Sequence, residues 1–171
     1  MDVRDLIGYN HAVRRLYLGS FAKLPWVEVV KPRGASFDSM RDVFLHLTLV
    51  EDRWINYVIP DRFNLWVDPV FDDFKDIESL KSYALSVEEK TQNYLQRLTP
   101  EELNRQMVVP WGEKPYPRLS VEAVLTHMVM EDMIHYGELS ALLWQMGEEA
   151  PYRAFWRYIY INKISERTCK R

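Results

Sequence analysis

Four long stretches of the chain carry apolar residues at alternating spacings of three and four positions, and this periodicity constrains the fold most. Such spacing places apolar side chains along one face of an α-helix. It predicts helices from about residue 2 to Pro25, from about residue 38 to Pro60, from Ile77 to Pro100, and from Ser120 to Met146. Proline lacks a backbone N–H and clashes with the preceding turn, so it suits a helix end. We therefore expect an all-α fold, a four-helix bundle.

The connections between these helices differ in character. Residues 25–37 contain two prolines and a glycine without a clear period, and Ser36 or Asp38 is expected to cap the helix that follows. Residues 60–76 are rich in Asp, aromatic residues and Pro, which predicts an irregular lid or a long crossover. Residues 103–118 favour a short hairpin-like excursion. Gly147 is predicted to end the fourth helix, and residues 152–171 are expected to form a short helix.

Length and composition bound the possible functions. At 171 residues the chain is expected to be one domain, residues 1–171, with a C-terminal extension from about residue 152. No apolar run reaches the roughly 20 residues that cross a bilayer, and no signal peptide precedes the first helix, so we expect a cytoplasmic protein without a membrane partner. The net charge of -3 argues against a nucleic-acid partner. Cys169 stands alone near the end and is interpreted as incidental.

The fourth predicted helix carries His127, Glu131 and His135 at equal steps of four residues. These positions fall within roughly 80° of one another on a helix, in an arc that also holds apolar residues and is expected to face the core. A buried carboxylate beside two imidazoles is costly unless a partner satisfies it, and a divalent cation satisfies all of them. On the second helix, His46 lies at the edge of the apolar stripe and is expected to face the fourth helix. We therefore predict a metal site of His46, Glu131 and His135.

Several alternatives stay open. His127 is an alternative or additional ligand, and if it coordinates in place of Glu131, the carboxylate becomes available as a general base toward water. Glu138 and Asp42 are expected to hydrogen-bond to the ligand side chains and fix their orientation, without binding the ion themselves. Any one of these histidines, taken alone, is more often a hydrogen-bonded core residue. Trp54, Trp111 and Trp144 are candidates for the wall of a pocket, although aromatics at helical spacing more often belong to the core.

The sequence resembles the DinB-like (DinB/YfiT-type) metalloenzymes. Their fourth helix typically reads His-x3-His-Glu-x2-His-Arg-Gly-Gln, and the matching stretch here is His127-Met-Val-Met-Glu131-Asp132-Met-Ile-His135-Tyr136-Gly137-Glu138. An Asn-led first helix (Tyr9-Asn10-His11), a histidine in the second helix (His46) and a Gly-x3-Pro ending (Gly147 to Pro151) also match. The resemblance implies a four-helix bundle with a metal site and, as in many relatives, a homodimer.

Departures from the family pattern affect the expected chemistry. Glu131 stands where the family usually has a ligand histidine, which changes a three-His site into two His and one carboxylate. Such a set binds Zn, Ni, Fe or Mn. Tyr136 and Glu138 replace the usual Arg and Gln.

The resemblance implies a metal-dependent enzyme acting on a small molecule: a thiol S-transferase using a low-molecular-weight thiol, or a hydrolase. The alternative is a non-catalytic, stress-related metal-binding or interaction protein with a structural site. A ferritin-like di-iron protein ranks last, because only Asp132-x-x-His135 approaches its Glu-x-x-His motif.

Overall fold

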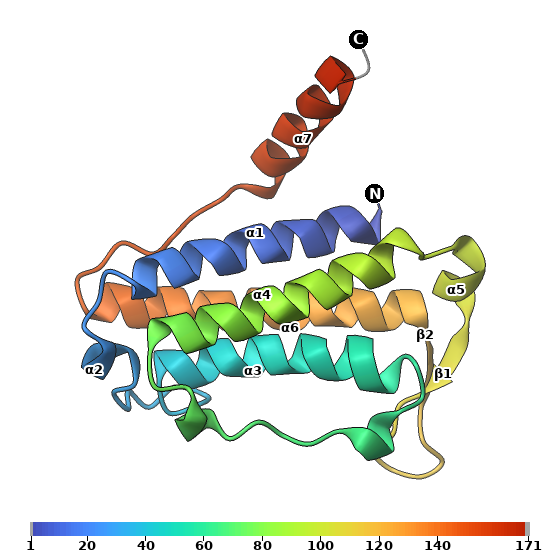
Figure 1. The fold of residues 1–171 in the computed structure, drawn as a ribbon, viewed down its shortest axis with the longest axis horizontal. Helices are drawn as coiled ribbons and strands as arrows, with labels where there is room; N and C mark the ends of the chain where they lie inside the picture. Colours follow the sequence, from blue (N-terminus) through green and yellow to red (C-terminus); the bar gives the residue numbers. More distant parts are fainter. Residues whose placement is uncertain (1, 170–171) are drawn as a thin grey trace.

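The computed structural model describes residues 2–169, with side chains as far as residue 162. Four long helices lie side by side (Figure 1): α1 (Val3–Phe21), α3 (Met40–Arg53), α4 (Ile77–Gln96) and α6 (Val121–Gln145). Helix α3 contacts α4 and α6, and α1 contacts the same two helices. We refer to these four helices as the helical body. The expectation of a predominantly α-helical protein is confirmed.

Local sequence explains where the long helices begin. The side chain of Ser39 accepts a hydrogen bond from the Asp42 backbone N–H at the start of α3, so the expected caps Ser36 and Asp38 were wrong by one to three positions. Asp76 caps α4 in the same way and forms a reciprocal pair with Ser79. Ser120 caps α6 through the Ala123 N–H. Each cap satisfies a backbone donor that has no partner within its helix.

Helix ends agree less closely with the positions of proline. Helix α1 ends at Phe21, and α3 continues through a π-helical segment, Trp54–Val58, almost to Pro60. Helix α4 ends at Gln96, and Pro100 opens the short helix α5 (Pro100–Asn104) instead of closing α4. Proline is well tolerated in the first turn of a helix, where its missing N–H has no intrahelical acceptor. Gly147 follows α6 with a φ of 78°, as expected for a glycine that ends a helix.

The connections add short elements. Helix α2 (Trp26–Val29) lies within the first connection. Between α3 and α4 the chain forms two 3-10 turns, Phe63–Leu65 and Phe71–Asp73, and runs back along the helical body, so that α3 and α4 point the same way (Figure 1). This segment is the expected crossover. Strands β1 (Gln106–Val108) and β2 (Arg118–Ser120) form the expected hairpin, with Met107 opposite Leu119.

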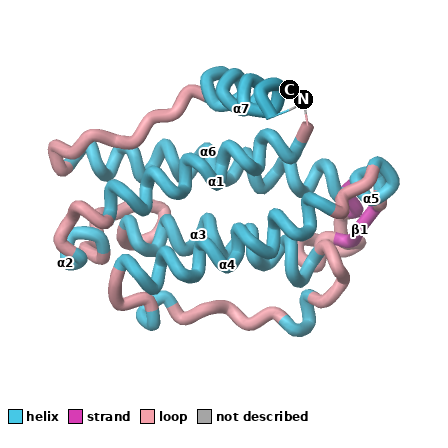
Figure 2. Tube along the Cα trace, turned by 45° about the horizontal axis from the view of Figure 1, so that its top comes forward, coloured by secondary structure: helices cyan, strands magenta, loops and turns pink. Residues whose placement is uncertain are grey.

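The C-terminal helix α7 (Phe155–Cys169) lies outside the helical body, beside α1 (Figures 1 and 2). Its contact with the body centres on Tyr9, whose ring packs edge-on against Phe155 and Tyr158 and whose hydroxyl donates to the Arg153 carbonyl. The expected helix in the extension is thus confirmed. Within residues 2–169, no helix has both the length and the apolar character needed to cross a membrane.

The core of the helical body consists of two apolar clusters. One lies toward the hairpin and includes Trp54 and Leu125, and the other lies toward the opposite end and includes Phe44 and Leu139. Buried polar residues of α1, α3, α4 and α6 lie between the two clusters in sequence or directly beside a residue at the edge of one: Asn10, His11, Arg14, Glu51, Thr91 and Asp132. The middle of the body is therefore polar.

The face of α1 that is buried differs from the predicted one. Apolar spacing of three and four residues predicts a buried stripe through Leu6, Tyr9, Val13 and Leu16. In the structure Tyr9 packs against α7 and Leu16 is exposed. The buried face instead contains Ile7, Arg14 and Tyr17. The apolar stripe was misread because part of the true buried face is charged, and an outward-facing aromatic residue is covered by the extension.

Candidate metal centre

Two adjacent helices bring together the three residues predicted as ligands. His46 projects from α3, while Glu131 and His135 are one turn apart on α6. One ligand atom from each of the three residues lies within 4.8 Å of the others. Ligands bound at about 2.1 Å to one tetrahedral ion are roughly 3.4 Å apart, so a small closure of the side chains would complete such a site.

His135 is held in a defined orientation. Its Nδ1 lies 3.0 Å from Glu138 Oε2, and this carboxylate also accepts hydrogen bonds from the backbone N–H and the hydroxyl of Ser36. Although burial opposes it, these bonds from Ser36 and His135 lower the pKa of Glu138. An ionised Glu138 favours the tautomer of His135 with the proton on Nδ1, which leaves Nε2 free as a ligand atom. Glu138 therefore occupies the orienting position expected from the sequence.

Glu131 lies between two histidines of its own helix. One carboxylate oxygen is 3.9 Å from His135 Nε2, and the other is 4.0 Å from His127 Nδ1. Both separations are too long for hydrogen bonds, and the first is suited to two ligands that share an ion. Glu131 is partly exposed, so the group is accessible from one side.

His46 lies against aromatic rings on two sides. The Phe37 ring stacks on it at a centroid distance of 4.1 Å, and the His135 ring meets it at 4.9 Å. Burial, then the neighbouring His135 and the positive charge of Arg53, lower the pKa of His46 from 6.5 to about 4. The imidazole is consequently neutral near pH 7, which is the form that coordinates metals.

Two other predicted residues lie elsewhere. His127 is half exposed and outside the group of three, and the stripe of residues 127, 131 and 135 follows the border of the core instead of facing it as predicted. The carboxylate of Asp42 accepts hydrogen bonds from Ser39 and Arg41 at the start of α3, with no contact to His46 among the described side chains. Asp42 therefore takes part in the cap and in an ion pair at the start of α3, and its expected orienting role stays a prediction.

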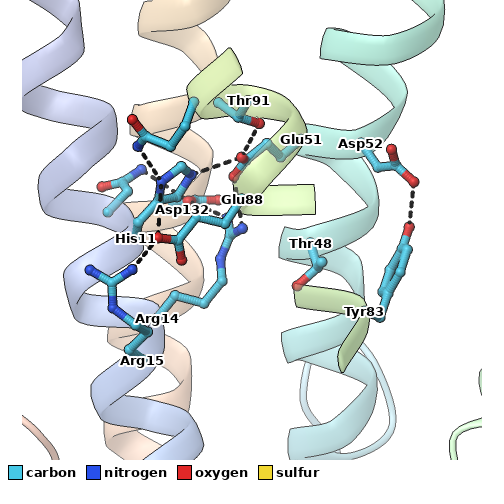
Figure 3. A network of polar contacts seen from close by, with 12 residues as sticks. His11, Arg14, Arg15, Thr48, Glu51, Asp52, Tyr83, Glu88, Thr91 and Asp132 are labelled. Atoms are coloured by element: carbon cyan, nitrogen blue, oxygen red, sulfur yellow. Dashed lines mark hydrogen bonds and ion pairs between the residues drawn. The ribbon is translucent and has the colours of Figure 1, made fainter. Parts of the chain in front are cut away.

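Sequence reasoning missed a network of buried charges beside the metal group (Figure 3). The Arg14 guanidinium lies 2.7 Å from Glu51 and 2.9 Å from Asp132, and all three side chains are almost fully buried. Glu51 also contacts His11 Nε2 at 2.8 Å and accepts a hydrogen bond from Thr91. Asn10 donates to Asp132. The only sequence signal was the cluster of polar residues at positions 10, 11 and 14 within a helix.

The pKa values of both carboxyl groups in the network are shifted from their ordinary values. Burial raises the pKa of Asp132 to about 6, although Arg14 opposes the shift. Burial also acts to raise the pKa of Glu51, but Arg14 and then His11 hold it well below its ordinary value. Glu51 is therefore the ionised partner of Arg14 near neutral pH. Asp132 directly follows Glu131 on α6, so the network is adjacent to the metal group.

Two of the tryptophans considered from the sequence pack together on the hairpin side of the helical body. Trp54 and Trp111 pack edge to face with centroids 4.8 Å apart, and Trp54 also meets the His127 ring at 6.1 Å. The Arg53 guanidinium lies over the Trp111 ring, 5.2 Å from its centroid. Trp144, the third tryptophan considered from the sequence, is exposed near the end of α6. Of these three tryptophans, only Trp54 and Trp111 pack against each other.

Fold and site define a class of protein. It is a predominantly α-helical protein whose central pair of helices carries a two-histidine, one-carboxylate group that fits a divalent metal ion. The model of the DinB family matches residues 1–167, and the chain belongs to this family. A comparison with curated proteins finds no match.

Proposed function

We propose that the protein is a divalent-metal-dependent enzyme that acts on a small molecule, as a thiol S-transferase or a hydrolase. The observation that carries the proposal is the convergence of ligand atoms from His46, Glu131 and His135 within 4.8 Å, on a side of α6 that is partly exposed. Three protein ligands with access from outside are typical of a catalytic site, whereas structural sites are usually closed by four. Family membership over nearly the whole chain supports the proposal, and we assign the helical body to the four-helix bundle of the DinB/YfiT type.

Each residue of the site has a proposed role, either in binding the ion or in orienting a ligand. His46, Glu131 and His135 are the ligands, and Glu138 keeps His135 oriented with Nε2 toward the ion. The bound ion would act as a Lewis acid and lower the pKa of a coordinated thiol or water near neutral pH. Phe37, which stacks on His46, restricts water around the site. The choice among Zn, Ni, Fe and Mn, and the assignment of a low-molecular-weight thiol as the substrate, stay predictions of the resemblance.

The test is the metal content of the purified protein, measured by elemental mass spectrometry. We expect close to one ion per chain in the wild type and its loss in His46→Ala, Glu131→Ala and His135→Ala. His127→Ala is the matched control, because His127 is on the same face of α6 but outside the group. Retention in His127→Ala identifies Glu131 as the third ligand. A protein that binds no metal after reconstitution would exclude the enzyme proposed here.

A structural metal site is the second candidate, favoured by the extensive burial of His135. Cobalt substitution separates the two, since an open site changes its visible absorption when a small thiol is added and a closed one does not. An unchanged spectrum would favour the non-catalytic, stress-related protein. The homodimer and the cytoplasmic location stay predictions, with chromatography coupled to light scattering as the measurement for the former.

A further inference from the structure

Arg53 stands out among the cations of the helical body because it has no anionic partner among the described side chains. Its Nε is buried without a hydrogen-bond partner. The group's described contact is the face of Trp111, which provides cation–π attraction but accepts no hydrogen bond. Arg14 and Arg33 also have a buried Nε without a hydrogen-bond partner, but both of them, like Arg41, pair with a carboxylate. A buried donor without an acceptor is costly, and a ligand that supplies the acceptor relieves this cost.

The position of Arg53 relates it to the metal group. Arg53 follows His46 by seven residues on α3, which is almost two full turns, so both project from nearly the same face about 10 Å apart along the axis. Helical side chains lean toward the N-terminus of their helix, which brings the guanidinium closer to His46 than the backbone spacing suggests.

Aromatic side chains surround Arg53. Trp111 and Trp54 pack together beside it, and Trp54 links it to His127, one turn from Glu131 on α6. Helix α3 changes into a π-helix directly after Arg53, and such segments are frequent at functional sites. The Trp111 ring and the Arg53 guanidinium together place an apolar surface next to a fixed positive charge.

We propose that Arg53 is a specificity-determining residue that binds the carboxylate of the small-molecule substrate, with Trp111 contacting its apolar part. The proposal rests on the proposed metal-dependent function. The Nε and Nη donors of a guanidinium match the two oxygens of a carboxylate, and one guanidinium balances one negative charge. The substrate class is thus an elongated monoanion with its reactive group at the metal and its carboxylate about two helical turns away.

The test compares two ω-thiols of equal length, mercaptohexanoate and the neutral mercaptohexanol, titrated into zinc-loaded protein by calorimetry. We expect the wild type to bind the acid about tenfold more tightly than the alcohol, which corresponds to about 1.4 kcal/mol. Arg53→Met should abolish this preference while leaving the affinity for the alcohol and the zinc content unchanged. Arg53→Lys keeps the charge but lacks the planar fork, and should retain only part of the preference.

The control is Arg97→Met, which removes the same charge from an exposed position at the end of α4. It should keep the wild-type preference, and circular dichroism verifies that each variant is folded. Equal affinity of the wild type for the two thiols, or a preserved preference in Arg53→Met, would overturn the role of Arg53. Absence of zinc from the wild type would instead overturn the proposed function, so the two failures are distinguishable.

Discussion

Arg14 lies at the centre of the buried charges, 2.7 Å from Glu51 and 2.9 Å from Asp132, with its side chain 2% exposed. Replacing it with Met leaves carboxyl groups in the core without a counter-charge. We expect Arg14→Met to lower the free energy of unfolding by about 3–5 kcal/mol, as is usual when one partner of a buried ion pair is removed. Urea denaturation followed by circular dichroism measures this loss.

The neighbouring Arg15 provides a matched control. It is half exposed and pairs with Glu88 at the surface, where water screens the interaction. Arg15→Met should change the free energy of unfolding by less than about 1 kcal/mol. Similar losses in the two variants would contradict a dominant role for burial in the Arg14 network.

Glu51 should make stability depend on pH. Although burial opposes it, Arg14 and His11 hold the pKa of Glu51 below its ordinary value of 4.5. As the pH falls through this value, the unfolded chain binds a proton that the folded chain still excludes. The stabilisation from Glu51 is therefore fully present above its unfolded pKa and is lost at lower pH.

We expect the free energy of unfolding of the wild type to fall between pH 5 and about pH 3 more steeply than that of Glu51→Gln. Urea titrations of both proteins across this range provide the comparison. Parallel pH profiles would show that Glu51 has the same pKa in the folded and unfolded chains.

At the scale of elements, the candidate centre joins α3 to α6. An ion that binds only when both helices are in place stabilises the folded chain by about 2.7 kcal/mol when its free concentration is one hundred times the dissociation constant. We expect zinc to raise the unfolding midpoint and a chelator to reverse the change. His135→Ala should show no response to zinc, and an equal response there would place the ion elsewhere.

The capping residues show why these two elements align. Ser39 begins α3 and Ser120 begins α6, and the two helices run in opposite directions through the body (Figure 1). Their middle turns consequently lie at the same level, where His46 faces His135. Insertion of one residue into either helix before its ligand would rotate that ligand by about 100° relative to the preceding part of the helix.

At the scale of the whole molecule, the candidate metal centre and the buried charged network both lie in the middle of the helical body. The apolar clusters at its two ends supply the hydrophobic stabilisation, and the charged network of Arg14, Glu51 and Asp132 lies between them. Glu131 and Asp132 are consecutive on α6, so one carboxylate faces the candidate metal centre while the next faces the network. Helix α7 lies apart from this region, against Tyr9.

The sequence by itself determined the four long helices, because apolar periodicity and breaking residues act over neighbouring positions. It also determined that Glu131 and His135 share a helix face, since four residues make about one turn. The hairpin and the crossover were likewise predictable from local composition. These features depend on interactions within a segment, which the order of residues contains directly.

Only the tertiary structure decided which helix faces meet. It buried Arg14 with Glu51 and Asp132, turned His127 outward, and placed Arg53 beside Trp111. Each of these outcomes depends on how helices distant in sequence rotate about their axes to bury the largest apolar area. That rotation is set by the sum of many side-chain contacts, and a charged residue can lie on the buried face once a partner from another helix neutralises it.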